Sequence, residues 1–194
     1  MTKISSLCVY CGSRMPTDPS HIDASKSLGQ ALAENGIRLV YGGGHVGLMG
    51  VIADATLAAN GQVIGIIPRH LHDIEVGHEK LTELHVVDSM HVRKEKMFQI
   101  SDAFAVLPGG LGTLDETFEM ITWRQLRLHD KPILLVNHKK YWQPLLDLME
   151  HMIDAGFVEA EARGFFTVVE RLEEIIPALM KEPEAEFKAD ISKF

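Results

Sequence analysis

Short, continuous apolar runs rich in β-branched residues alternate along this chain with longer segments of helical period. Continuous hydrophobicity is typical of strands that are covered on both faces, as in a parallel sheet between two layers of helices. We therefore expect an α/β fold with a doubly wound, Rossmann-like parallel sheet of about seven strands flanked by helices. The expected strands lie at residues 4–10, 37–41, 62–67, 83–87, 103–107, 132–137 and 165–169. The expected helices lie at residues 20–34, 47–59, 89–100, 114–128, 141–155 and 170–180.

The length of 194 residues suffices for one sizeable core, and no linker rich in Gly, Ser or Pro divides the chain. We expect a single α/β domain over residues 1–180 and a loosely held tail over residues 181–194. The formal charge of −8 argues against a broad nucleic-acid surface. No apolar run reaches the roughly 18 residues of a membrane span, and the N-terminal stretch is too short and interrupted for a secretory signal. We expect a cytoplasmic protein that binds neither nucleic acid nor membrane.

Glycines gather where three of the expected strands end. The sequence CGSR follows the first strand at residues 11–14, GGGHVGLMG follows the second at 42–50, and PGGLGT follows the fifth at 108–113. A glycine turn that leads from a strand into a helix directs free N–H groups and the positive end of the helix dipole at an anion. The pattern predicts a nucleotide or other phosphate-bearing ligand. Its predicted contacts are Ser13, Gly43, Gly44, Gly109, Gly110, Leu111, Gly112 and Thr113.

The second glycine segment also contains the spacing GxGxxG, at Gly42, Gly44 and Gly47. This spacing is a weak indication of a dinucleotide site when it stands alone. An NAD site also needs an acidic residue at the end of the next strand, where this chain has Pro68 and Arg69. NAD is therefore disfavoured, while an NADP site with Arg69 on the extra phosphate remains an alternative.

Two other groups of residues are typical of redox or metal sites. Cys8 and Cys11 have the CxxC spacing, but both lie in or beside an expected strand and face opposite sides of it, so we expect buried free thiols. Histidines and acids crowd residues 69–80 (RHLHDIEVGHEK), but their spacing does not match a closed zinc site. We expect a polar loop that acts as a lid over the site, with no metal and no cofactor.

Two further stretches are more specific in combination than either glycine segment. They are MHVRKEKM at residues 90–97 and PGGLGTLDE at residues 108–116. Together they resemble the paired signatures of the LONELY GUY family of cytokinin riboside 5'-monophosphate phosphoribohydrolases, whose bacterial members were long misnamed lysine decarboxylases. The likeness covers nearly the whole chain. It includes CGS at 11–13, YGGGxxGLMG at 41–50, ITW at 121–123 and GF at 156–157.

The resemblance implies an N-glycosidase that splits purine riboside 5'-monophosphates, of the cytokinin type or AMP itself, into free base and ribose 5-phosphate. It assigns catalytic roles to Arg93 and Glu116, and it suggests Lys94, Thr122 and Glu75 as substrate contacts. It also implies a homodimer with sites near the subunit interface. Cleavage develops positive charge on the ribose, which a nearby carboxylate stabilises. This chemistry gives a reason for an acid beside a phosphate loop.

Several alternatives remain open at this stage. Residues 113–116 (TLDE) alone are typical of a capping box, in which the Glu116 side chain accepts from the Thr113 amide and takes no part in chemistry. The same sheet edge is also compatible with a carrier or sensor that binds a nucleotide or phosphorylated cofactor without cleaving it. Arg14, Arg124 and Arg127 depart from the usual family sequence, which leaves the preferred base open. A pyridoxal-dependent decarboxylase is disfavoured because nothing singles out a Schiff-base lysine.

Overall fold

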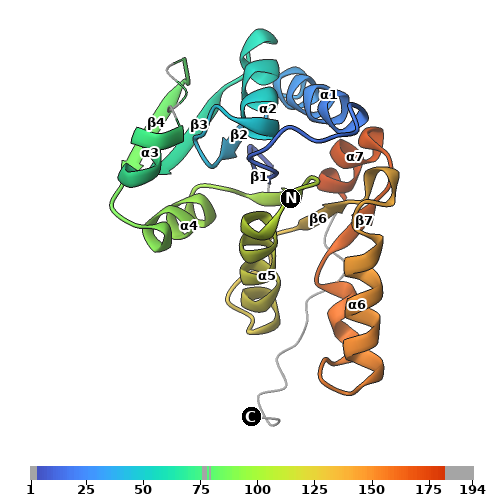
Figure 1. The fold of residues 1–194 in the computed structure, drawn as a ribbon. Helices are drawn as coiled ribbons and strands as arrows, with labels where there is room; N and C mark the ends of the chain where they lie inside the picture. The colour runs from blue at the N-terminus through green and yellow to red at the C-terminus, as the bar shows by residue number, and fades with distance from the viewer. Residues whose placement is uncertain (1–3, 76–77, 79, 182–194) are drawn as a thin grey trace.

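The structure, a computed structural model, describes residues 4–75, 78 and 80–181. Within these residues, seven parallel strands form one sheet in the order β4-β3-β2-β1-β5-β6-β7 (Figure 1). This confirms the predicted doubly wound α/β fold, and every expected strand is present. The strands are β1 (Ser6–Tyr10), β2 (Arg38–Tyr41), β3 (Val63–Pro68), β4 (Glu83–Val87), β5 (Ala103–Val106), β6 (Ile133–Val136) and β7 (Thr167–Val169).

Helices cover both faces of the sheet, as Figure 1 shows. The helices α1 (Ser20–Glu34), α2 (Gly47–Ala58) and α7 (Ile175–Met180) lie on one face. The helices α4 (Met90–Gln99), α5 (Leu111–Gln125) and α6 (Gln143–Asp154) lie on the other. Short 3₁₀ turns occur at His138–Lys140, Ala160–Gly164 and Leu172–Glu174. No helix in the described ranges is both long enough and apolar enough to span a lipid bilayer.

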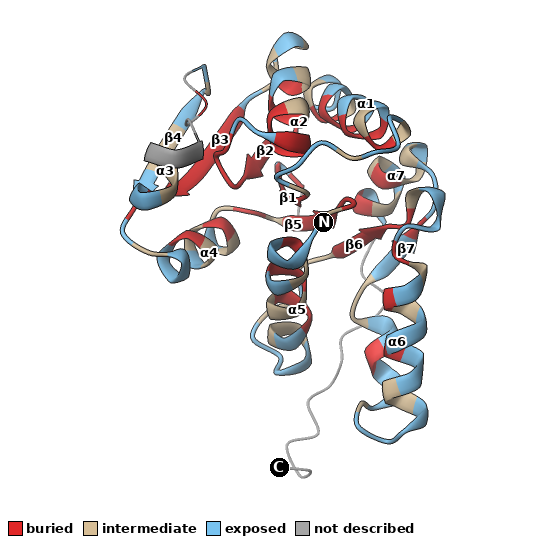
Figure 2. Ribbon diagram, in the orientation of Figure 1, coloured by how far each residue is buried: buried red, intermediate tan, exposed pale blue. Residues whose placement is uncertain are grey.

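The strands β1, β3, β5 and β6 are buried at every residue, and the side chains of the sheet contribute to two separate cores (Figure 2). In β1 and the residue after it, Leu7, Val9 and Cys11 belong to the core beneath α1 and α2, whereas Cys8 and Tyr10 belong to the core beneath α4 and α5. The two cysteines therefore face opposite sides of the sheet, as predicted, and both are free and buried. Burial raises the pKa of both thiols, which keeps them protonated and unreactive.

Two local predictions were wrong. The helix expected at residues 114–128 begins earlier, at Leu111, because the Leu114 amide donates to the Gly110 carbonyl at 3.0 Å and closes a first turn that contains glycine. The stretch expected to be a loop at residues 69–80 begins with a short helix, α3 (Arg69–Glu75). A helix of this length offers too few residues for a periodic signal. The predicted tail at 181–194 lies, after Lys181, outside the described residues.

The order of the strands determines where a ligand can bind. From β1 the chain builds outward through β2 and β3 to β4, and it then returns to place β5 on the other side of β1. The connections that leave β1 and β5 therefore diverge to opposite faces and leave a crevice between the carboxyl ends of these two strands. In doubly wound sheets this reversal point is where ligands bind.

Candidate active site

A cavity of about 600 Å³ opens beyond the carboxyl ends of β1 and β5. Residues 11–14, which follow β1, and residues 108–113, which follow β5, form two of its walls. Leu48 and Met49, at the start of α2, contribute a third wall. The ligand site predicted from the glycine segments therefore coincides with a cavity at the reversal point of the sheet.

The turn between β5 and α5 presents an open helix N-terminus to this cavity. Gly110 is the N-cap of α5 and has no side chain to cap the helix. A Cβ atom added at Gly110 or Gly112 would have no neighbour within 4 Å, so the space beside this backbone is free. The Tyr141 hydroxyl donates to the Gly109 carbonyl at 2.7 Å and holds the turn in place. First-turn amides without intrahelical partners, together with the helix dipole, suit a bound anion.

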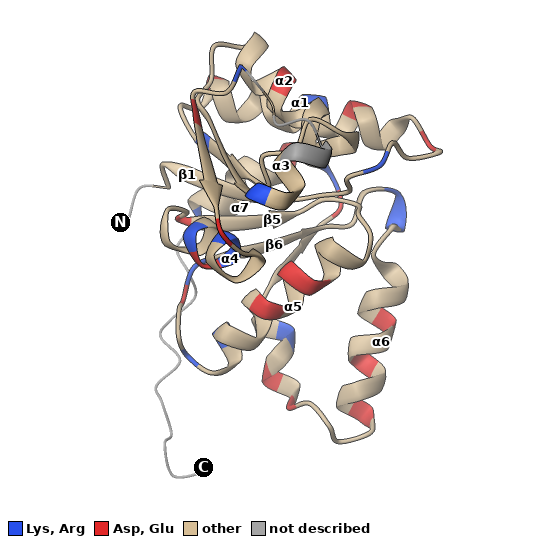
Figure 3. Ribbon diagram, turned by 60° about the vertical axis from the view of Figure 1, so that its left-hand side comes forward, with Lys and Arg blue, Asp and Glu red and all other residues tan. Residues whose placement is uncertain are grey.

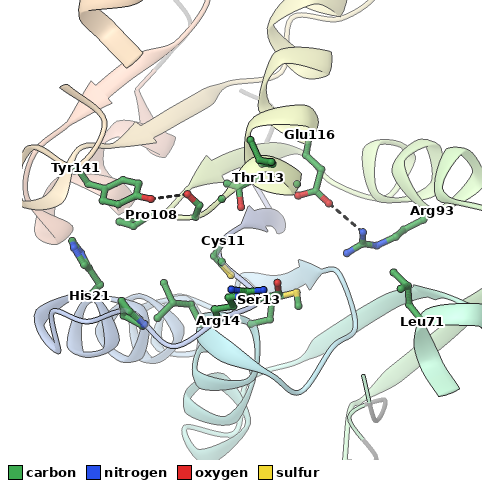
Figure 4. A pocket seen from close by; sticks show the side chains of 18 residues that line it. Cys11, Ser13, Arg14, His21, Leu71, Arg93, Pro108, Thr113, Glu116 and Tyr141 are labelled. Atoms are coloured by element: carbon green, nitrogen blue, oxygen red, sulfur yellow. Dashed lines mark hydrogen bonds and ion pairs between the residues drawn. The ribbon is translucent and has the colours of Figure 1, made fainter. Parts of the chain in front are cut away.

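A buried ion pair also lines the cavity. Arg93 Nη1, from α4, lies 3.4 Å from Glu116 Oε1, from α5, and each side chain is 10% exposed (Figure 4). Two backbone carbonyls hold the arginine in place: Nε donates to the Ile66 carbonyl at 3.1 Å and Nη2 donates to the Gly42 carbonyl at 3.3 Å. Arg93 thereby connects the ends of β2 and β3 to the carboxylate on α5.

The environment of Glu116 makes its protonation responsive near neutral pH. Burial raises the pKa of Glu116 to about 7, and the neighbouring Arg93 guanidinium opposes this rise. Lys94 Nζ, one residue further along α4, lies 3.1 Å from both Asp115 Oδ2 and Glu119 Oε1. Two basic residues of α4 are thus paired with three acidic residues of α5, and Figure 3 shows the charged residues of both helices by colour. Glu116 alone among these acids lines the cavity.

The capping-box alternative for residues 113–116 is wrong. Since α5 begins at Leu111, Thr113 lies inside the first turn and is not the N-cap. The Glu116 side chain faces Arg93. The Thr113 carbonyl instead accepts a bond of 2.6 Å from the Thr117 hydroxyl.

The cavity wall contains eight of the thirteen predicted site residues. They are Ser13, Arg93, Gly109, Gly110, Leu111, Gly112, Thr113 and Glu116.

The other five predicted residues are placed differently. Gly43 and Gly44 do not line the cavity, and the Gly43 carbonyl accepts from the His78 amide at 3.4 Å. The Lys94 ammonium group is engaged by the acids of α5, and Thr122 is exposed further along that helix. Glu75 ends α3, and its side chain lies outside the described residues.

The four arginines noted in the sequence lie in different places in the structure. Arg14 lines the cavity. Arg69, named for the NADP alternative, is exposed on α3 and is not part of the cavity wall. Arg124 donates to the Lys131 carbonyl at 3.2 Å, and Arg127 is exposed with a left-handed φ of 59°.

Several residues that line the cavity were not predicted from the sequence. His21 on α1, Leu71 on α3 and Tyr141 after β6 all line it. His21 is buried, at 8% exposure, and its ring makes an edge contact with Tyr141, at 5.6 Å between ring centroids. These residues lie in no shared motif, and only the topology of the sheet brings them together. The polar character of His21 within an apolar helix face was the one local signal.

The histidine stretch at residues 69–80 contributes His78 to a small polar cluster away from the cavity. The side-chain ligand atoms of His45, Asp54 and His78 all lie within 4.8 Å of one another. His78 Nε2 lies 2.9 Å from Asp54 Oδ1, and the Lys80 amide donates to His78 Nδ1 at 3.3 Å. This second bond places the proton of a neutral ring on Nε2, where it is donated to Asp54. The pair therefore ties residue 78 to α2 by a hydrogen bond.

Comparisons with known proteins agree with these motifs. The family model described as possible lysine decarboxylase matches residues 49–179. A cytokinin riboside 5'-monophosphate phosphoribohydrolase of Rhodococcoides fascians is 43% identical over 175 residues, which cover 90% of this chain and 88% of that protein. A cytokinin riboside 5'-monophosphate phosphoribohydrolase of Arabidopsis thaliana is 41% identical over 183 residues, and the match covers 91% of this chain and 86% of that protein.

A solved structure, that of the molybdenum cofactor carrier protein of Chlamydomonas reinhardtii, has the same fold. Its TM-score is 0.67 at 18% identity, and the match covers 91% of this chain and 96% of that one. This likeness concerns the fold alone. The identity to the phosphoribohydrolases, in contrast, extends over most of both chains, and the match to the family model includes both signature stretches. The chain therefore belongs to the LONELY GUY family of cytokinin riboside 5'-monophosphate phosphoribohydrolases.

Proposed function

We propose that this protein hydrolyses the N-glycosidic bond of purine riboside 5'-monophosphates, of the cytokinin type or AMP, and releases the free base and ribose 5-phosphate. Family membership supports the proposal. The observation that carries it is the buried Arg93–Glu116 pair, which shares one cavity with an unobstructed helix N-terminus. An anion site and a carboxylate one helical turn apart in one cavity suit a sugar phosphate whose reacting carbon is separate from its phosphate.

In this proposal the turn at residues 108–113 binds the 5'-phosphate. The amides of the first turn of α5 donate to its oxygens, and the helix dipole favours its charge. Because one end of the ribose is then fixed, the reacting carbon C1' is already oriented, and no further loss of entropy is needed at the moment of reaction. The binding energy of the phosphate is thus converted into positioning at the other end of the sugar.

Glu116 acts on the ribose and on water. As the C1'–N bond breaks, its electron pair leaves with the base, which takes up a proton, and positive charge develops on the sugar ring. The Glu116 carboxylate stabilises that charge and accepts a proton from the water whose oxygen bonds to C1'. Arg93 favours the ionised form of the carboxylate, and its own bonds to the Ile66 and Gly42 carbonyls keep it in place beside Glu116.

We also propose that the protein is a homodimer through the face formed by α5 and α6. Large apolar side chains are exposed there: Leu126 at 56%, Leu128 at 64% and Leu148 at 49%. Thr122, a predicted substrate contact, is one turn from Leu126 and shares its side of α5. A second subunit on this face would cover the apolar residues and bring the substrate contacts close to the interface. Light scattering of the purified protein measures its mass and tests this proposal.

The enzymatic proposal is tested by base release. The purified protein is incubated with AMP and with isopentenyladenosine monophosphate, and free bases are separated by chromatography. We expect release by the native protein and a loss on the order of 1,000-fold in kcat for Glu116→Gln, because the variant lacks the charge that stabilises the transition state. Asp115→Asn is the matched control. It removes an exposed acid from the same helix turn, and we expect kcat within about threefold of native.

The alternative is a carrier or sensor with the same binding site. The fold is shared with a molybdenum cofactor carrier protein, so a binding role without cleavage has a structural precedent. Binding of either nucleotide without release of base, unchanged in Glu116→Gln, would favour this alternative. The ratio of rates with the two substrates also establishes which base is preferred.

A further inference from the structure

Arg14 is the second arginine of the cavity wall, and its guanidinium group is unengaged by the residues that the structure describes. The first, Arg93, forms an ion pair with Glu116 and donates hydrogen bonds to two backbone carbonyls. Arg14 makes no hydrogen bond or ion pair with any residue in the described part of the chain. Its side chain is exposed to the cavity, on the wall across from Thr113 and Glu116 (Figure 4).

The backbone beneath Arg14 is firmly held between the two glycine segments. The Gly12 amide donates to the Pro108 carbonyl at 3.0 Å, and the Gly12 carbonyl accepts from the Leu48 amide at 2.9 Å. Gly47 packs so closely that a Cβ atom there would lie 2.3 Å from the Arg14 nitrogen. The turn that carries Arg14 is therefore fixed beside the phosphate turn and the start of α2.

The other positive side chains near the cavity are already paired with acids, so a bound phosphate would need a further cation. Lys94 is paired with Asp115 and Glu119, and Arg93 is paired with Glu116. The amides at the start of α5 supply hydrogen bonds but no full charge. A phosphate dianion bound there would meet three nearby acids, and among the cations of the cavity wall only Arg14 is uncommitted in the described residues.

We propose that Arg14 binds the 5'-phosphate of the substrate and thereby makes the site select phosphorylated ribosides over uncharged ones. The inference rests on the proposed function and assigns a specificity-determining residue to it. The planar guanidinium group can donate two parallel hydrogen bonds to a phosphate, which a lysine cannot do. The expected loss on removing this interaction is about 10- to 100-fold in affinity for the phosphate group.

The test compares Arg14→Gln with Arg38→Gln. Arg38 is exposed at the first residue of β2, at the end of the sheet opposite the cavity. For each variant we would measure kcat and KM with AMP, the rate with adenosine, and the dissociation constant of ribose 5-phosphate by calorimetry. For Arg14→Gln we expect KM for AMP to rise about 10- to 100-fold, kcat to stay within about threefold, and the adenosine rate to stay unchanged. Arg38→Gln should match the native protein, and Arg14→Lys should recover part of the loss.

Two results would overturn the inference. One is an unchanged KM and an unchanged affinity for ribose 5-phosphate in Arg14→Gln. The other is a changed oligomeric mass by light scattering with unchanged phosphate affinity, which would place Arg14 in a subunit contact. If the native protein releases no base at all, the proposed function fails, but calorimetry with ribose 5-phosphate still decides the role of Arg14.

Discussion

Residues 42–50 and residues 108–113 are both glycine-rich turns that lead from a strand into a helix, yet their surroundings differ. In the first turn, Cβ atoms added at Gly42, Gly47 and Gly50 would lie 1.9, 2.3 and 2.1 Å from other atoms of the protein. In the second turn, a Cβ atom added at Gly109 would lie 2.1 Å from Thr113 Oγ1, but Cβ atoms added at Gly110 and Gly112 would meet nothing within 4 Å. Glycine in the first turn lets chain segments approach one another. In the second it leaves room for something that is not protein.

This difference assigns separate tasks to the two turns. The first turn supplies the Gly42 carbonyl that holds Arg93, and its Gly47 packs against the backbone of Arg14. The second turn supplies the open N-terminus of α5 and, one turn later, Glu116. The first turn thus positions cations, and in the proposed function the second receives the phosphate. Substitutions in the two turns should therefore affect different measured quantities.

Among substitutions in the two turns, the largest effect is expected for Gly42→Ala. The added methyl group would lie 1.9 Å from Arg93 Nη2, so the arginine must leave its place between the Gly42 carbonyl and Glu116. We expect kcat for base release to fall on the order of 100-fold or more because the carboxylate loses its positioned partner. Overpacking should also lower the free energy of unfolding by about 1–3 kcal/mol. A kcat within threefold of native would contradict the view that this glycine makes room for Arg93.

The next effect concerns pH. Since burial raises the pKa of Glu116 from its ordinary value of 4.5 to about 7, and since the ionised form is the active one, kcat/KM should fall about tenfold per pH unit below pH 7. Removing the arginine contact through Gly42→Ala should move this acidic limb to higher pH, because Arg93 lowers that pKa. A profile that is flat between pH 5 and pH 8 would remove Glu116 as the titrating base.

The same pKa predicts a change in stability of definite sign. The folded state binds the Glu116 proton more tightly than the unfolded chain does, so protonation of Glu116 stabilises the fold. This stabilisation is complete below pH 4.5 and is lost as the pH rises through about 7. Glu116→Gln cannot ionise and should not lose this contribution. From pH 5 to pH 8 the native protein should therefore lose up to about 3 kcal/mol relative to the variant, as measured by denaturant unfolding. Equal changes in the two proteins would contradict the raised pKa.

The sequence predicted those features that depend on neighbours in the chain. Continuous apolar runs placed all the strands, and the ends of β1 and β5 correctly indicated where the cavity lies. The start of α5 was misplaced because glycine normally disfavours a helix interior, whereas here Gly112 lies in the first turn, where no side chain fills the space. At Gly112, the low helix propensity of glycine conflicts with the open space that the cavity has beside this backbone.

Features that depend on distant packing were not predictable. Spacing alone did not distinguish the two glycine turns, because the closeness of Arg93 to Gly42 depends on how α4 packs against β2 and β3. The engagement of Lys94 by two acids similarly depends on the position of α4 beside α5. His21 and Tyr141 line the cavity only because the sheet reverses between β1 and β5.

The smallest effect, and the most direct test of the second turn, is expected for Gly112→Ala. The methyl group would meet no protein atom, and alanine favours a helix, so the free energy of unfolding should rise by up to about 1 kcal/mol. The same methyl group would occupy space beside the amides that receive the phosphate, so KM for AMP should rise several-fold while kcat stays near its native value. Gln125→Ala, at the other end of α5, is the control and should leave KM unchanged. A stabilised protein with a native KM would mean that the phosphate does not approach this turn, and the distinction between the two glycine turns would then rest on packing alone.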